Sequence, residues 1–143
     1  MNPIELCHAA VQARDNAYAP YSGYRVGAAL LCADGTIVTG CNIENASYPV
    51  SVCAERVALS NAVSSGKTEF RAIAVVGGKG PQLGAFAYPC GMCRQALAEF
   101  CSADLPIYFM NERGIIEVRT LGELLPCGFS ADHLRDPRDR KGR

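Results

Sequence analysis

The chain has 143 residues, of which 49% are hydrophobic and 20% are charged, so it suits one ordinary domain that buries its own core. Fourteen Lys+Arg balance fourteen Asp+Glu, which leaves no net positive field to hold a nucleic-acid backbone or an anionic membrane. We therefore expect a small uncharged ligand, and neither nucleic acid nor membrane as a partner.

The N-terminal segment has no basic stretch followed by an apolar one, which argues against a signal peptide. No run approaches the roughly 20 apolar residues that span a bilayer. Eight cysteines are many for this length, and in a reducing compartment they are more often thiols or metal ligands than disulfides. We expect a cytoplasmic protein.

The first elements follow from apolar spacing and turn residues. Helical spacing predicts an amphipathic helix over 3–18, ended by Pro20 and Gly23. Two strand-like runs, Val26–Cys32 and Thr36–Cys41, flank the sequence Ala-Asp-Gly. Asp-Gly tolerates the positive φ of tight turns, so these runs are predicted to form a hairpin.

The rest of the chain alternates helices with strands. The predicted elements are a helix over 47–67, a strand over 71–78, a helix over 90–101, strands over 105–111 and 114–120, and a short helix over 121–126. This order indicates an α/β fold, a three-layer α/β/α sandwich with a mixed five-stranded sheet. No repeat or linker is present, so we expect one domain over 1–129 and a charged, flexible tail over 130–143.

Cysteines stand at the starts of two predicted helices. Cys90 and Cys93 have the spacing of either a metal-binding pair or a redox pair. Cys53 stands at the start of the preceding helix, and helix N-termini favour thiolate over thiol. If crossover connections bring both helix starts to one edge of the sheet, three thiolates form a zinc site whose fourth position is open to water, as in catalytic sites.

Each of these pieces also has a plainer interpretation. Cys53 alone is typical of a small buried thiol, and Glu55 alone of a solvated first-turn acid. Cys90 and Cys93 alone fit a thioredoxin-type redox pair. A non-catalytic zinc module is a further alternative, although no fourth ligand follows the three cysteines at a normal spacing.

The combination is more specific than its parts. Cys-x-Glu at one helix start, with Pro-Cys-x-x-Cys about 35 residues later, resembles the signature of zinc nucleobase deaminases, in which the Glu is acid and base. The motifs that extend this likeness are YAPYSGYRVGAALL, GCNIENASYP, CAER and PCGMCRQ, in that order. Over Tyr18–Phe129 the chain is similar to the small cytidine deaminases with a three-cysteine zinc site.

The resemblance implies a function and an assembly. A homotetramer with sites shared between subunits would deaminate free cytidine and deoxycytidine to uridine and deoxyuridine, releasing ammonia, in pyrimidine salvage. Cys53, Cys90 and Cys93 would hold one Zn²⁺ per subunit. Glu55 would take a proton from water and deliver it to N3 of cytosine. Blasticidin-type deaminases share these four residues, but the ribose motif favours a nucleoside.

The resemblance also assigns substrate contacts. The implied residues are Asn42 and Glu44 at the ribose 3′-OH, the Ala54 backbone at the pyrimidine O2, and the aromatic residues Tyr24, Tyr48 and Phe129. Tyr24 stands where the family usually has Phe. Tyr48 and Phe129 match positions that reach into a neighbouring subunit's site, and Phe129 would stack on the pyrimidine.

Other roles stay open on the residues alone. Asn42 and Glu44 also fit turn residues that close the hairpin, and Phe129 also fits a local anchor for the last helix. Arg56, and less favourably Arg94, is a candidate counter-charge to the thiolates, with a solvated helix cation as the alternative. We expect His8 and His133 to be surface residues. The simplest interpretation of the other five cysteines is that they are buried thiols: Cys7, Cys32, Cys41, Cys101 and Cys127.

Overall fold

The computed structural model describes residues 2–140, in which one five-stranded sheet has the order β2-β1-β3-β4-β5. Only β3 and β4 run parallel among its neighbouring strands, so the sheet is mixed. The strands are β1 (Tyr24–Cys32), β2 (Ile37–Cys41), β3 (Phe70–Lys79), β4 (Pro106–Met110) and β5 (Ile116–Thr120). The helices are α1 (Pro3–Arg14), α2 (Ala54–Ser64), α3 (Gly91–Phe100) and α4 (Leu121–Leu124), with 3-10 helices at Tyr48–Val50, Ala131–Leu134 and Pro137–Arg140.

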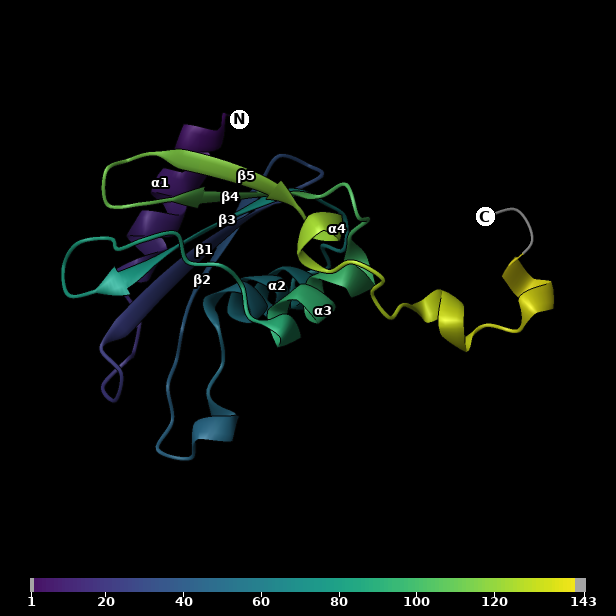
Figure 1. Cartoon of the computed structure of the whole chain (residues 1–143), viewed down its shortest axis with the longest axis horizontal. Coiled ribbons are helices and arrows are strands. Elements are labelled where there is room, and N and C mark those ends of the chain that lie inside the picture. The colour runs from purple at the N-terminus through teal and green to yellow at the C-terminus, as the bar shows by residue number, and fades with distance from the viewer. Residues whose placement is uncertain (1, 141–143) are drawn as a thin grey trace.

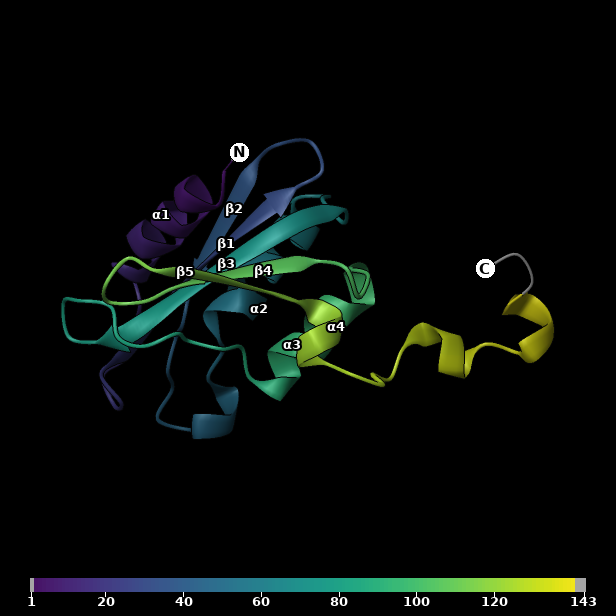
Figure 2. The ribbon, with the colours of Figure 1, turned by 45° about the horizontal axis from the view of Figure 1, so that its top comes forward.

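The helices cover both faces of this sheet (Figure 1). One core cluster joins α1 to β1, β3 and β4, and a second joins the opposite face of the sheet to α2, α3 and α4. Figure 2 shows the same separation of α1 from α2 and α3 after a 45° turn. The predicted three-layer α/β/α fold with a mixed five-stranded sheet is therefore confirmed.

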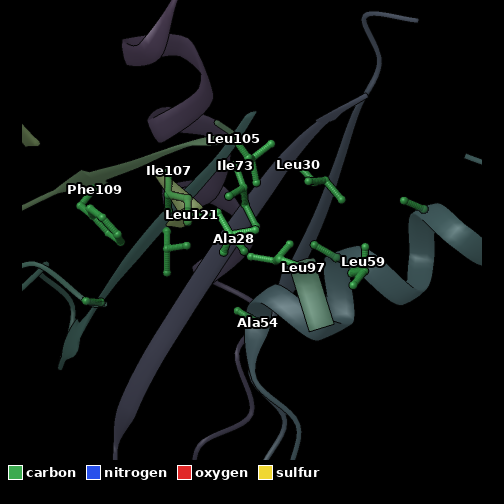
Figure 3. Close-up of a cluster of buried hydrophobic side chains, with 14 of the residues drawn as sticks. Ala28, Leu30, Ala54, Leu59, Ile73, Leu97, Leu105, Ile107, Phe109 and Leu121 are labelled. Carbon is green, nitrogen blue, oxygen red and sulfur yellow. The ribbon is translucent and has the colours of Figure 1, made fainter. Parts of the chain in front are cut away.

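The packing of α2 on the sheet fixes the place of its first turn. Figure 3 shows Leu30, Ile73 and Leu59 in the cluster between the sheet and α2. Small residues let the helix come close: a Cβ at Gly40 of β2 would lie 2.4 Å from the Ala58 amide nitrogen and 2.6 Å from the Ala54 carbonyl oxygen. Such approaches are far below van der Waals contact, so only glycine permits this distance.

The largest differences from the predicted helix boundaries are at the end of the first helix and at the start of α2. The first helix ends at Arg14 and not at residue 18, and α2 begins at Ala54 and not at residue 47. The cause is a tertiary ladder, because Ile43 pairs in parallel with Tyr18 on one side and antiparallel with Val52 on the other. These bridges hold Tyr18 and Val52 in extended pairing beside the two helix ends and override local helical preference.

The segment after α4 leaves the body of the domain. Residues 130–140 extend away from the sheet in both Figure 1 and Figure 2, and the rest of the predicted tail lies outside the described residues. His8 and His133 are exposed, as predicted. Within 2–140, the structure contains no helix with the length and apolar character of a membrane span.

The cysteines read as buried thiols divide into three groups. Cys7 and Cys32 are buried, and Cys41 and Cys101 are half-buried. The prediction was wrong for Cys127, which is exposed. Cys127 lies in a turn beyond α4 with a φ of 54°, where no helix or strand face carries its side chain into the core.

Candidate active site

Three cysteines meet where α2 and α3 begin. Cys53 and Cys90 are the N-cap residues of the two helices, and neither side chain caps its helix. The Sγ atoms of Cys53 and Cys90 are 3.8 Å apart, and those of Cys90 and Cys93 are 3.5 Å apart. All three lie within 4.8 Å of one another. The expected convergence of the two helix starts is present.

The geometry of the cluster fits a zinc ion. Tetrahedral Zn–S bonds of about 2.3 Å place neighbouring sulfur atoms about 3.8 Å apart, close to the two measured separations. Cys90 is exposed while Cys93 is buried, so the cluster opens on one side. Three sulfur ligands with one open side match the donor set of a catalytic site and not of a closed structural one.

The groups around the cluster favour a thiolate at Cys53, while the hydrogen bond with Cys53, and then burial, raise the pKa of Cys93. Hydrogen bonding with Cys93, and then with Arg56 and Cys90, lowers the pKa of Cys53 to about 5. The Arg56 Nη2 donates to the Cys53 Sγ across 3.8 Å. Burial opposes the charge of Arg56, but hydrogen bonds to Cys93 and Cys53 raise its pKa. Arg56 is thus a cation facing the thiolates and not a solvated helix residue.

Arg94 has a different role. Its Nε donates to the Pro89 carbonyl at 2.7 Å, and its Nη1 donates to the Leu124 carbonyl at 2.7 Å. These bonds tie the start of α3 to the end of α4. Arg94 is therefore a link between two elements that support the cluster, with its donors turned toward carbonyls.

Glu55 is buried beside the cluster in the first turn of α2. Its side chain is 4% exposed, so the interpretation as a solvated first-turn acid is wrong. Burial, followed by the charge of Cys53, raises the pKa of Glu55 to about 7. A carboxyl group in this range can both accept and donate a proton near neutral pH.

Cys53, Cys90 and Glu55 line a cavity of about 360 Å³, whereas the buried Cys93 does not line it. The polar residues Ser22, Asn42 and Glu44 line the same cavity. Ala54, in the first turn of α2, also lines it. The first amides of a helix have no partner within the helix, so the amide of Ala54 is available to a ligand.

Asn42 and Glu44 have structural partners as well as a place in the cavity. The Asn42 Oδ1 accepts from the Val26 amide at 2.8 Å, and its Nδ2 donates to the Tyr24 carbonyl at 2.8 Å. Glu44 accepts from the amides of Tyr21 and Ser22 at 3.0 and 3.1 Å, and from the Ser22 hydroxyl. Each side chain keeps hydrogen-bonding capacity beyond these contacts, so the structural and ligand-binding interpretations are compatible.

Sequence reasoning missed one wall of the cavity, formed by Phe86, Ala87 and Tyr88. The Tyr88 ring meets Phe109 edge-on with centroids 4.8 Å apart, and its hydroxyl donates to Glu117 at 2.9 Å. These residues lie in the loop between β3 and α3, which has no periodicity. The sequence feature that could have indicated them is their position just before Cys90 and Cys93.

Of the remaining aromatic candidates, one lines the cavity and two lie outside it. Tyr24 lines the cavity, next to Val26 of the same strand. Tyr48 and Phe129 do not line it, and their side chains are 69% and 55% exposed. Phe129 stacks on His133 with centroids 5.1 Å apart. Within one chain, these two rings are separate from the cavity.

Comparison with known proteins gives matches along most of the chain. A family model, the cytidine and deoxycytidylate deaminase zinc-binding region, matches residues 2–109. A cytidine deaminase from Sporosarcina psychrophila is 48% identical over 135 residues, which are 94% of this chain and 96% of that protein. The crystal structure of cytidine deaminase from Burkholderia pseudomallei has a TM-score of 0.83 at 45% identity, covering 90% of this chain and 100% of that one. A blasticidin-S deaminase from Bacillus cereus is 31% identical over 111 residues, 75% of this chain and 78% of that protein.

The family match and the geometry agree on the metal. The matched region contains the cysteine cluster and Glu55. Zinc is the cofactor that this region binds in the family, and the sulfur separations fit it. The chain therefore belongs to the cytidine and deoxycytidylate deaminase family.

Proposed function

We propose that this protein is a zinc-dependent cytidine deaminase that hydrolyses free cytidine and deoxycytidine to uridine and deoxyuridine, releasing ammonia. One observation carries the proposal: two of the three clustered thiols, Cys53 and Cys90, and a buried carboxyl group line one cavity together with polar groups suited to a sugar. The cavity volume of about 360 Å³ suits a nucleoside-sized ligand. The family and its relatives support this substrate class.

The three cysteines would hold the metal. A zinc ion on Cys53, Cys90 and Cys93 would act as a Lewis acid that lowers the pKa of water toward neutrality. Arg56 would offset part of the negative charge of the three thiolates, since it already donates to the Cys53 Sγ. This role explains a cation at the third residue after the N-cap Cys53, in the first turn of α2.

Glu55 would move the protons of the reaction. Its carboxylate would accept a proton from the attacking water and donate it to N3 of cytosine, which makes C4 more electrophilic. It would then transfer the second water proton to the 4-amino group, which leaves as ammonia while the water oxygen becomes O4 of uridine. A pKa of about 7 suits both directions of transfer.

Substrate orientation would come from the walls of the cavity. Asn42 and Glu44 would bind ribose hydroxyls, and the Ala54 amide would donate to O2 of the pyrimidine. Tyr24 would pack on the nucleoside with its ring, as an aromatic in this position can do on a sugar or a base. These contacts place C4 toward the cysteines and Glu55.

The proposed assembly is a homotetramer whose sites are completed by neighbouring subunits. The single-chain cavity lacks Tyr48 and Phe129, which are exposed and outside it. Large exposed aromatic side chains are typical of contact surfaces. In the assembly, Tyr48 and Phe129 would enter a partner's site. The catalytic domain would comprise residues 1–129, and a cytoplasmic location would keep the eight cysteines reduced.

A spectrophotometric deamination assay tests the function. Zinc-loaded protein should convert cytidine and deoxycytidine, with slower or no conversion of CMP, cytosine and blasticidin S. Turnover of blasticidin S with no turnover of either nucleoside would overturn the substrate assignment. Metal analysis of the same sample should give about one zinc per chain, and a disulfide-reductase activity in its place would favour the redox alternative.

A further inference from the structure

Arg14 is a buried cation that the proposed mechanism does not use. It stands in the last turn of α1, and its side chain is 2% exposed. Its guanidinium donates to five backbone carbonyl oxygens: Arg25 at 3.0 Å, Gly78 at 2.7 Å, Gly80 at 2.6 Å, Pro81 at 3.2 Å and Gln82 at 3.1 Å. A buried charge is costly unless such groups surround it, so this arrangement depends on all five.

Three of these carbonyls, from Gly80, Pro81 and Gln82, belong to one loop, and the Gly78 carbonyl lies just before it in β3. Residues 78–82 wrap around the guanidinium where β3 ends, and the same segment continues into the Phe86–Tyr88 wall of the cavity. The loop is closed behind the guanidinium because the Gly84 amide donates to the Gly77 carbonyl at 2.9 Å. Arg14 therefore sets the path by which the chain reaches that wall.

The fifth carbonyl belongs to β1, the strand beside β3, in which Arg25 pairs with Gly78. Arg25 lies between Tyr24 and Val26, which both line the cavity. Asn42 bonds to the backbone of these two neighbours, while Arg14 bonds to the residue between them. One guanidinium thus connects the β1 wall of the cavity with the loop that leads to its other wall.

We propose that Arg14 is a positioning residue for the deaminase site, which holds the Tyr24–Val26 wall and the Phe86–Tyr88 wall at a fixed separation. Arg14 does not line the cavity itself. Only the planar fork of arginine, with five N–H donors, serves carbonyls that are spread in this way. The inference rests on the proposed function, because the separation of the two walls affects activity only if a nucleoside binds between them.

The expected effect falls on substrate binding. Without the guanidinium, the loop loses the group that its carbonyls surround, and the walls that bracket the nucleoside move apart. Cys53 and Glu55 lie on α2, on the opposite face of the sheet from α1, so the reacting groups keep their places. Arg14→Met and Arg14→Lys should each raise KM for cytidine about tenfold or more and change kcat by less than about threefold.

The experiment compares zinc-loaded variants in the deamination assay. Arg71→Met is the matched control, because Arg71 is an exposed arginine at the other end of β3 and should leave KM unchanged. Thermal unfolding and zinc content are measured on each variant. A KM for Arg14→Met within about twofold of the wild type, or a loss of kcat and zinc at unchanged KM, overturns the proposal.

A second variant reaches the same loop without touching Arg14. A Cβ at Gly78 would lie 2.4 Å from the Gly84 amide nitrogen and 2.8 Å from the Gln82 carbonyl oxygen, so Gly78→Ala must displace the loop. It should raise KM in the same way. If Arg14→Met does not fold, an unchanged KM in Gly78→Ala overturns the proposal. Absence of turnover by the wild type would instead refute the proposed function.

Discussion

The Nη2 of Arg56 lies 3.8 Å from the Sγ of Cys53, so the residue that follows Glu55 in the sequence faces the thiolate cluster. The Nε of the same side chain is buried and has no hydrogen-bond partner among the described residues. An unpaired buried N–H donor costs free energy of folding. The attraction of the Arg56 guanidinium to the cysteine thiolates offsets that cost. The position therefore favours a cation when the three cysteines are thiolates.

Replacement of Arg56 should reduce activity more than zinc content. Arg56→Gln removes the positive charge and keeps some polarity, so the thiolates become more electron-rich and a bound metal becomes a weaker Lewis acid. Such partners of metal ligands typically contribute 10–100-fold in metal affinity or activity, and we expect kcat/KM to fall by about that amount. The matched control is Arg113→Gln, since Arg113 is exposed. Equal activities in both variants would contradict the role of Arg56.

Replacement of Glu55 should abolish most of the activity while zinc stays bound. Glu55→Gln keeps the size of this buried side chain but can neither accept nor return a proton. General acid–base catalysis contributes about 10²–10⁴-fold, so kcat should fall by at least this range. Zinc content measured beside the rate separates this effect from metal loss. A variant with kcat near that of the wild type would rule out Glu55 as the proton carrier.

The cysteine cluster was predictable because its signal is local. Cys90 and Cys93 are three residues apart at a helix start, and Cys53 and Glu55 are two apart at another. Helix starts carry their own chemistry, and alternation of strands with helices constrains where such starts meet. The family resemblance then linked the two segments. Nothing beyond the sequence was required for these four positions to be candidates.

The contacts of Arg14 and the absence of α-helix over residues 47–52 were not predictable, for one physical reason. The carbonyl partners of Arg14 lie 11 residues away at Arg25 and 64 to 68 residues away at the end of β3 and in the loop after it. Helical spacing marked Arg14 only as one residue of an amphipathic helix. The absence of α-helix before α2 likewise depends on the bridge between Ile43 and Val52. Both features come from contacts between distant segments, which local patterns do not contain.

Glu44 should act on the sugar and not on the base. Glu44→Gln weakens the acceptor for a ribose hydroxyl, and hydrogen bonds to charged groups are worth more than neutral ones. We expect KM for cytidine to rise about tenfold. The control is 2′,3′-dideoxycytidine, which lacks the 2′- and 3′-hydroxyl groups and keeps the 5′-hydroxyl, so the substitution should change its KM little. An equal rise for both substrates would show that Glu44 has a structural role alone.

The pH dependence of cytidine binding should follow from the partners of Glu44. Hydrogen bonds from the Ser22 hydroxyl and amide, then from the Tyr21 amide, lower the pKa of Glu44. At pH values above the unfolded pKa of about 4.3, Glu44 is a carboxylate and contributes its full stability to the folded state. As the pH falls through the lower pKa of the folded state, the carboxylate is protonated and this stability is lost. The contribution of Glu44 to KM should stay flat down to about pH 5, apart from the titration of Glu55, whose pKa is about 7. Ser22→Ala should move the rise in KM to higher pH, and an unchanged profile would contradict this assignment.

Thiol labelling should separate the metal ligands from the other cysteines. Burial raises the pKa of Cys7 and Cys101 to about 11, so at neutral pH both remain protonated and unreactive, because the thiolate is the nucleophile. Cys127 is exposed and should react first with iodoacetamide in the zinc-loaded protein. Chelation of zinc should then make Cys53 and Cys90 reactive, since the metal no longer shields them. Peptide mass mapping before and after chelation measures each site, and labelling of Cys90 at the rate of Cys127 in zinc-loaded protein would exclude it as a ligand.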